Sequence, residues 1–492
     1  MADLISNNPN IIEQAGDFNL NKVNLISYRF DGEEGAPYEI DIKPITVNIQ
    51  VVEDIHKACL MGSITVYDSQ DVRTVLPITG LEKLELSFNT PGMPGVHAVR
   101  DEGFPFNVYK IEAVTADKVN PRAQYYKIYF CSNEMYHNTI NRVSRSYAGL
   151  IEYGVEDLLR NKLKSKKKLY YEPTRSNTKI IIPNLQPLEA IDMLSEKALS
   201  GAYKNGGYHF YETTNGFYFR SIESMLAIGG AAARPSAYKF NYQITNTQGK
   251  VKDVANDLKS VIRYHFERPT NLLYNLNEGM FASKLISSDL YNKTITTTQY
   301  DYNDEFGNSF HTEHENGEKT PLKSLLPRAF FEDTGKYLSS MYDSRIMHYS
   351  NTQEIYNDYK DIDAKDYVQN RHSQLLSMSN VNLNLVTYGN TLLHAGDIIN
   401  FDFPLMRPVG EDVLESNPYW GGRYLILALK HNISVVDNRH EMNIKCMKDA
   451  VRNNYAIETN TNTINTQEYG SPVENIYSKD NDMLNLDILE DI

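Results

Sequence analysis

The stretch that decides the fold is Asn380–Phe403, NVNLNLVTYGNTLLHAGDIINFDF. Its first half alternates apolar side chains (Val381, Leu383, Leu385) with polar ones, a period of two that predicts a half-buried strand. Turn-forming residues follow at 389–390 and 395–397, and a second apolar run ends at Pro404. Strands joined by such short turns pair in an antiparallel manner, so we expect an antiparallel β cluster here.

The same pattern continues beyond this stretch and recurs near the start of the chain. Arg423–Asn432 and Arg439–Lys448 predict closing strands of the same cluster. A separate set of strands is predicted at Val23–Phe30, Tyr38–Glu53, Ala58–Asp68, Glu82–Asn89, Phe104–Asp117 and Gln124–Ser132. About seven short strands with short turns between them indicate an antiparallel barrel or sandwich.

Between the two β clusters the hydrophobic period changes. Helices are predicted at Asn133–Asn141, Gly154–Lys164, Pro187–Ser200 and Asp366–Met378, where apolar residues recur at helical spacing. A hairpin is predicted over 208–222 and a pair of strands over 280–302. The polar, turn-rich segment 301–321 predicts a long exposed loop.

The predicted fold class is therefore α+β and β-rich, with two similar antiparallel β-barrel domains flanking an α+β insert and an extended C-terminal tail. The expected divisions are a flexible arm at 1–20, a first barrel at 21–132 and the first part of the insert at 133–240. The second barrel begins at 241–270, the second part of the insert occupies 271–378, and the barrel resumes at 379–450. Residues 451–492 form an acidic tail.

Composition narrows the function. The chain has 492 residues, a formal net charge of −14 and 35 tyrosines. So acidic a chain argues against nucleic-acid binding, which needs clustered Lys and Arg, but it is compatible with a duct through which nucleic acid slides. Tyrosine suits both half-buried strands and protein interfaces, and both interpretations stay open. The N-terminus has no signal-peptide pattern and no apolar run is long enough to cross a membrane, so we expect the chain to fold in a reducing cytoplasm without membrane insertion.

No chemical constellation is found, and we assign no catalytic, cofactor-binding or metal-ligating residue. Cys59, Cys131 and Cys446 are widely spaced and predict buried hydrophobic side chains rather than disulfides. The pair His311 and His314 lies in a polar segment and is better explained by chance than as a metal site. His209 lies in a predicted strand and is interpreted as a structural histidine.

A lysine run at 162–168 follows the second helix. It fits either an anion-binding patch or a solvated helix end, and the second interpretation is favoured in an acidic chain.

Two segments resemble the baseplate hub subunit of T-even-like contractile-tailed phages. One is Asn277–Ile286, continuing through Asp289–Lys293 towards Tyr300–Tyr302; the other is Asn380–Phe403 with its Ala395-Gly-Asp397 corner. The closing segment from Arg423 to Asp449 is also similar to the last strands of such hubs. The order of parts matches over roughly residues 20–450, and hubs of other contractile injection systems share it.

The resemblance implies a non-enzymatic virion protein of the tail baseplate. It implies a homotrimer forming a pseudo-sixfold ring, with the sixfold tail tube or a tube-initiator protein above and a central spike trimer below. Tape-measure and baseplate wedge proteins are further expected partners. DNA would pass through the ring without specific binding, and we expect acidic side chains to dominate its lining. No cofactor is implied.

The chain departs from the hub pattern in segment 301–321 and in the tail, which we expect to hold a neighbouring copy or the spike. Three alternatives stay open within the sequence. One is the hub of a bacterial contractile secretion or toxin-delivery machine; the second, of a different class, is a phage adhesin that binds host polysaccharide; the third is an enzyme that acts on cell walls.

Overall fold

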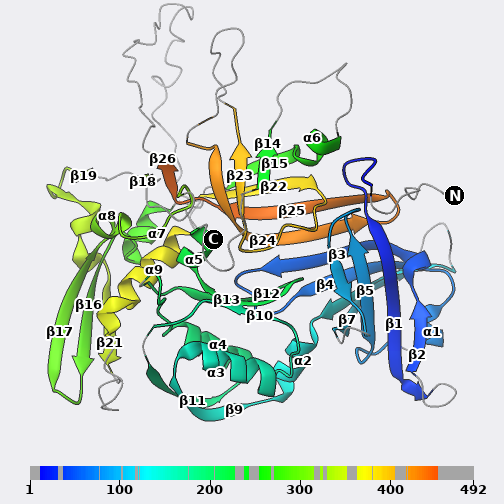
Figure 1. Cartoon of the computed structure of the whole chain (residues 1–492), viewed down its shortest axis with the longest axis horizontal. Coiled ribbons are helices and arrows are strands. Elements are labelled where there is room, and N and C mark those ends of the chain that lie inside the picture. Colours follow the sequence, from blue (N-terminus) through cyan, green and yellow to red (C-terminus); the bar gives the residue numbers. More distant parts are fainter. Residues whose placement is uncertain are drawn as a thin grey trace, which may run out of the picture. The chain divides into compact units, whose positions relative to one another are not determined.

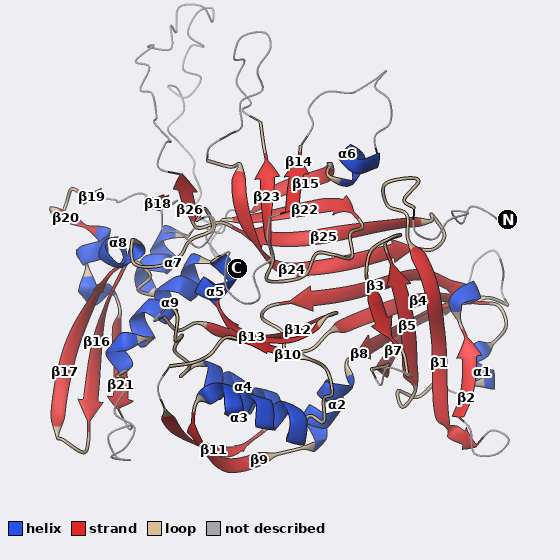
Figure 2. Ribbon diagram, viewed as in Figure 1, coloured by secondary structure: helices blue, strands red, loops and turns tan. Residues whose placement is uncertain are grey.

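The computed structural model describes residues 11–31, 37–76, 78–100, 104–116, 120, 122–175, 177–203, 205–227, 238–242, 254–267, 271–314, 322–324, 330–351, 363–378, 381–404, 417 and 419–452. These residues form a β-rich α+β protein with large antiparallel sheets (Figure 2). Residues 1–10 of the predicted arm at 1–20 and residues 453–492 of the predicted tail at 451–492 lie outside the described residues, so the predictions made for them stay predictions. Within the described part of the arm, strand β1 already begins at Asn19. No described helix is both long and apolar enough to span a bilayer.

The first strand set comes from the N-terminal quarter of the chain. Its strands are β1 (Asn19–Asp31), β2 (Pro37–Asp41), β3 (Thr46–Asp54), β4 (Met61–Asp68), β5 (Lys83–Asn89), β6 (Val96–Ala98), β7 (Phe106–Ala116) and β8 (Gln124–Cys131). Their inward side chains form one apolar core that includes Ile64, Phe88 and Phe130. The single strand predicted over 38–53 is wrong, because a 3-10 turn at Lys43–Ile45 containing Pro44 separates β2 from β3. Helix α1 (Val72–Val75) connects β4 to β5.

The second strand set comes from two distant parts of the chain. Its strands are β14 (Tyr238–Asn241), β15 (Val261–Glu267), β22 (Asn382–Tyr388), β23 (Ile398–Asp402), β24 (Gly422–Ser434) and β25 (Arg439–Met447). They surround a core rich in aromatic and aliphatic side chains, among them Phe240, Phe401 and Tyr424. β14 pairs in parallel with β23. Asn241, the last residue of β14, also forms a parallel bridge with Ser260, the residue before β15.

The two strand sets are joined edge to edge. β24 pairs antiparallel with β3 over seven consecutive positions, from Ala428 opposite Asp54 to Ser434 opposite Asn48. This junction, which we call the seam, makes one 14-stranded sheet (Figure 1). Eleven strands follow the order β15-β22-β25-β24-β3-β4-β8-β7-β5-β1-β2, while β23 pairs with β24, β14 with β23 and β6 with β5 beside this path. Segments nearly 400 residues apart in the sequence therefore share one hydrogen-bonded sheet.

The first part of the α+β insert packs around its own core. It contains α2 (Asn133–Ile140), β9 (Val143–Gly149), α3 (Ile151–Asp157) with a π-helical turn at Leu158–Lys162, β10 (Leu169–Tyr171), β11 (Thr178–Leu185), α4 (Pro187–Ser195), β12 (Tyr208–Thr213), β13 (Gly216–Ser221) and α5 (Ile222–Leu226). The apolar face predicted for the second helix is confirmed, because Val155, Leu158, Leu159 and Leu163 are fully buried. The β9–β11 pair was not predicted.

The second part of the insert contains the sheet β17-β16-β21 and several short helices. Its elements are α7 (Leu272–Asn277), β16 (Ala282–Asp289), β17 (Thr294–Asp301), α8 (Tyr302–Phe306), β18 (Leu322–Ser324), β19 (Phe330–Phe331), β20 (Lys336–Tyr337), 3-10 turns at Leu338–Ser340, Tyr342–Ser344 and Ala364–Asp366, β21 (Ile346–Asn351) and α9 (Val368–Ser377); β26 (Ala450–Arg452) pairs with β18. Helix α6 (Val254–Leu258) lies between β14 and β15 of the second strand set.

The prediction of a long exposed loop at 301–321 is wrong for its described part. Residues 302–306 are helical and His311–His314 are buried, because charged partners from the end of β25 neutralise their polar side chains. Residues 315–321 lie outside the described part of the chain.

Candidate functional site

The face of the continuous sheet that points away from the two cores is a polar surface that runs across both strand sets. Along the paired positions 48–54 of β3 and 428–434 of β24, every second side chain is buried and the intervening ones are half-exposed, as a two-sided strand requires. We call this surface the outer sheet face. It is built from Arg263, His265, Glu267, Asn384, Val386, Glu441, Asn443, Lys445, Lys430, Asn432, Asn48, Gln50, Val52, Asp54, Ser63, Thr65, Lys110, Glu112, Lys127 and Tyr129.

At the seam the outer sheet face is held by side-chain amides. Asn48 Nδ2 and Gln50 Nε2 both donate to Asn432 Oδ1, at 3.1 and 3.3 Å. Asn432 lies opposite Gln50 in the register, so these contacts tie a side chain of β24 to two side chains of β3. Cross-strand pairs of this kind stabilise a sheet and fix its register. The amides leave the surface polar without giving it a net charge.

This face carries both signs of charge. Lys430 lies opposite Val52 across the seam, and Asp54 lies opposite Ala428 two residues along. Towards the first strand set, Lys127 is paired in register with Glu112, and the Lys110 ammonium forms an ion pair with Glu112 at 3.1 Å. The outer sheet face is therefore a mixture of amides, hydroxyls and both signs of charge.

The inner side of the seam holds a buried carboxylate. Glu53 on β3 is fully buried and accepts hydrogen bonds from the backbone N–H groups of Thr214 and Ala395, both at 2.9 Å. His394 Nδ1 lies 3.2 Å from the same carboxylate. Burial alone raises the pKa of Glu53, but the His394 ring and these donors outweigh it and hold the pKa below its ordinary value. Through these contacts Glu53 joins β3 to the loop before β23, which carries His394 and Ala395, and to the β12–β13 turn, which carries Thr214.

A pair of histidines follows on the core side of β24 and β25. His431 Nδ1 and His440 Nε2 are 3.0 Å apart and both rings are buried beside Phe88 of the first strand set. Two imidazoles at this distance share one hydrogen when both are neutral. Burial lowers the pKa of His431 to about 4 and that of His440 well below its ordinary value. The pair is therefore neutral at pH 7.

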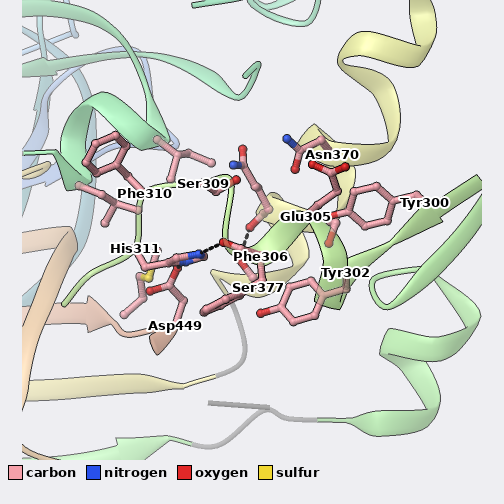
Figure 3. A pocket seen from close by; sticks show the side chains of 15 residues that line it. Tyr300, Tyr302, Glu305, Phe306, Ser309, Phe310, His311, Asn370, Ser377 and Asp449 are labelled. Atoms are coloured by element: carbon pink, nitrogen blue, oxygen red, sulfur yellow. Dashed lines mark hydrogen bonds and ion pairs between the residues drawn. The ribbon is translucent and has the colours of Figure 1, made fainter. Parts of the chain in front are cut away.

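The predicted histidine pair 311 and 314 lies in a second buried cluster, drawn in Figure 3. His311 Nδ1 lies 2.8 Å from Asp449 Oδ2 and its Nε2 lies 2.7 Å from the carbonyl oxygen of Phe306. Both neighbours only accept hydrogen bonds, so both ring nitrogens donate and the ring is a cation. Burial lowers the pKa of His311, but Asp449 outweighs it and raises the pKa above its ordinary value. Both ring nitrogens of His311 are thus engaged in hydrogen bonds, so this ring has none available to bind a metal.

Next to this cluster lies a buried ion pair. Lys448 Nζ and Glu313 Oε1 are 2.7 Å apart, and the two side chains are 0% and 1% exposed. The same carboxylate oxygen accepts from the backbone N–H of Arg423 at 3.1 Å. Consecutive residues, Lys448 and Asp449, therefore hold Glu313 and His311 and fix the segment after α8 against the end of β25.

These buried clusters offer little room for chemistry on a substrate. The cavity around Tyr302, Phe306 and Asn370 in Figure 3 has a volume of about 30 Å³, enough for water but not for an organic ligand. Among the described residues no group of three or more His, Cys, Asp or Glu side chains could hold a metal ion. The three cysteines are free and buried, as predicted, and burial raises the pKa of the Cys59 thiol well above its ordinary value. His209 lies in β12, where its ring contacts the Gly207 carbonyl and the His56 ring.

Sequence reasoning missed the buried charges at Glu53, Glu313 and Lys448. Glu53 did carry a signal, because it occupies an inward position of an alternating strand that the pattern reserves for an apolar residue. Glu313 and Lys448 gave no such signal, since their partner residues lie far away in the sequence.

No protein-family model matches this chain, and no curated protein matches it. Solved structures with a similar arrangement include the tail protein from Neisseria meningitidis MC58, with 8% identity and a TM-score of 0.48 over 88% of this chain and 97% of that one. The 43 kDa tail protein of prophage MuSo2 from Shewanella oneidensis has 10% identity and a TM-score of 0.46 over 87% and 98% of the two chains. An Escherichia coli component of the type VI secretion system has 8% identity and a TM-score of 0.39 over 82% and 73%. Since each TM-score lies below 0.5, we base the function on this chain's own residues.

Proposed function

We propose that this chain is the structural hub subunit of a contractile-tail baseplate. Three copies form a pseudo-sixfold ring that joins the sixfold tail tube, or a tube-initiator protein, to the threefold central spike and leaves a channel for DNA. The observation that carries the proposal is the seam, where two strand sets from separate parts of the chain pair in register and form one continuous sheet. Each chain presents two strand sets side by side, so a trimer presents six strand sets around its axis, which matches a sixfold tube.

Ring closure also accounts for the sheet edges. β15 ends the sheet order at one side, and it carries exposed Arg263, His265 and Glu267 alternating with half-buried Ile262 and Tyr264. Within the described residues this edge of β15 has no partner strand; such an edge is an aggregation hazard in a monomer, whereas a neighbour in a closed ring covers it. The edge contacts within the trimer are obligate interfaces, which commonly bury more than about 2,000 Å².

The outer sheet face is proposed as the lining of the channel. Its amides, hydroxyls and interspersed charges differ from the acid-dominated lining expected from the net charge, and we revise that expectation to a charge-balanced one. DNA is retained by surfaces that neutralise many phosphates together, and Lys430 and Lys445 among amides and carboxylates do not provide such a cluster. The surface suits the passage of a polyanion without capture.

The test is the mass of the full chain in solution, alone and with its spike protein, measured by light scattering and native mass spectrometry. We expect a trimer, either free or formed on spike binding, and rings with a central hole in electron micrographs. A chain that stays monomeric with and without the spike would refute the hub assignment. A trimer in which the outer sheet face points away from the hole would refute the channel lining alone.

A further inference from the structure

A cavity of about 480 Å³ lies between the first strand set and the α+β insert. This volume is within the range of roughly 300–1,000 Å³ that ligand sites occupy. One wall is apolar and includes Val96, Phe104 and Phe106. The opposite wall carries Lys166, Lys168 and Tyr170.

The apolar wall borders a gap in the large sheet. One edge of β5 pairs with β1 along most of its length. On the other edge, β7 pairs with Lys83 and Leu84, while β6 pairs with Leu86–Phe88. Within the described residues β6 has no other strand partner, and residues 94–98 line the cavity. The outer edge of β6 therefore presents backbone N–H and C=O groups to this space, as edge strands do.

The opposite wall is held in place by a buried charge cluster. Lys167 Nζ lies 2.9 Å from Glu134 and 2.5 Å from Glu212, and both carboxylates are buried. Burial lowers the pKa of Lys167, but these two carboxylates outweigh it and raise the pKa above its ordinary value. The central lysine of the run is thus neutralised and fixed, in contrast to the solvated helix end that the sequence favoured.

Lys166 and Lys168 lie on either side of Lys167 in the sequence and differ from it in their surroundings. Both are exposed and both line the cavity. No carboxylate within 4.0 Å of either ammonium is found in the part of the chain that the structure describes. Lys162 and Lys164 belong to the same run but do not line the cavity. Two cations, an apolar wall and a strand edge therefore meet at one site.

We propose that this cavity binds an acidic, extended segment of a partner protein. The segment adds a short strand to β6, places an apolar side chain against Phe104 and Phe106, and pairs its carboxylates with Lys166 and Lys168. Strand addition of this kind takes affinity from main-chain hydrogen bonds and specificity from alternate side chains. The free strand edge favours a peptide over a nucleic acid, which has no backbone N–H to donate. The proposal does not depend on ring assembly.

The experiment measures fluorescence anisotropy of a labelled hexapeptide of alternating leucine and glutamate with the full chain. We expect saturable binding that Lys166→Gln/Lys168→Gln weakens about tenfold, through loss of two charge-assisted contacts. The matched control, Lys162→Gln/Lys164→Gln, removes the same charge from the same run, and its affinity should stay within about twofold. The hexapeptide should also slow hydrogen exchange of the amides at 95–98. Equal melting temperatures of the two double variants would show that both fold.

Several outcomes would overturn the proposal. Equal weakening by both double variants would mean unspecific attraction to the lysine run, and unchanged exchange at 95–98 would exclude strand addition. No saturable binding of the hexapeptide up to about 1 mM, the weak end of specific affinities, would exclude the site. Equally tight binding of a thymidine hexanucleotide would make the cavity an anion site instead.

Discussion

Replacing Lys448 by methionine tests whether the buried ion pair fixes the segment after α8. Methionine keeps the length and the apolar stem of lysine but removes the ammonium, which lies 2.7 Å from Glu313 and 5.5 Å from the centre of the Tyr424 ring. The Glu313 carboxylate is 1% exposed, so it would lose its cation without gaining water. Breaking a buried pair from one side costs about 3–5 kcal/mol.

Two further variants test whether the loss of stability in Lys448→Met comes from leaving a buried charge without its partner. Lys284→Met removes the cation of the exposed pair with Asp343, whose carboxylate side chain is 81% exposed, and should cost little stability because water already solvates that carboxylate. The double variant Lys448→Met/Glu313→Leu removes both buried charges and should recover most of the loss, because apolar replacements of buried pairs are often neutral. The three variants separate an unpaired charge from a change of packing.

The assay is urea unfolding followed by the fluorescence of Trp420, the sole tryptophan of the chain. Its carbonyl oxygen accepts from the Tyr424 hydroxyl at 2.6 Å, so the indole reports on the region that the ion pair holds. We expect a lower unfolding midpoint for Lys448→Met than for Lys284→Met. The reasoning would be refuted if the two single variants lost equal stability, or if the double variant were less stable than Lys448→Met.

Two further predictions concern the seam and the outer sheet face. Burial lowers the pKa of His431 to about 4, below the ordinary value of about 6.5. As the pH falls, the unfolded chain therefore protonates this histidine before the folded chain does. The free energy of unfolding should fall by roughly 3 kcal/mol between about pH 6.5 and pH 4. Urea midpoints across this range should decline less steeply in His431→Asn, and an unchanged slope would contradict the assignment. Replacing Asn48, Gln50 and Asn432 together by lysine should make the assembled protein retain a DNA duplex, with a binding constant that falls steeply with salt, whereas the unaltered protein should retain none. Tight, salt-dependent binding by the unaltered protein in filter-binding measurements would count against a charge-balanced channel.

The sequence by itself determined the elements whose local pattern is strong. Alternation along 46–54 and 382–388 predicted strands because one side of each strand is buried and the other is not. The helical face containing Val155 and Leu159 was equally predictable. Turn chemistry located the β12–β13 hairpin. Each of these patterns reflects which side of a single element faces the core and which side faces solvent.

Only the tertiary structure decided which elements meet. The pairing of β3 with β24 joins residues almost 400 positions apart, and no local pattern encodes that choice. The same holds for His311 and Glu313, which a polar sequence placed in an exposed loop. They are buried because Asp449 and Lys448 neutralise them there, and burying a charge is tolerable only when such a partner is present. Charge pairing depends on distance in space, and the sequence alone does not contain that distance.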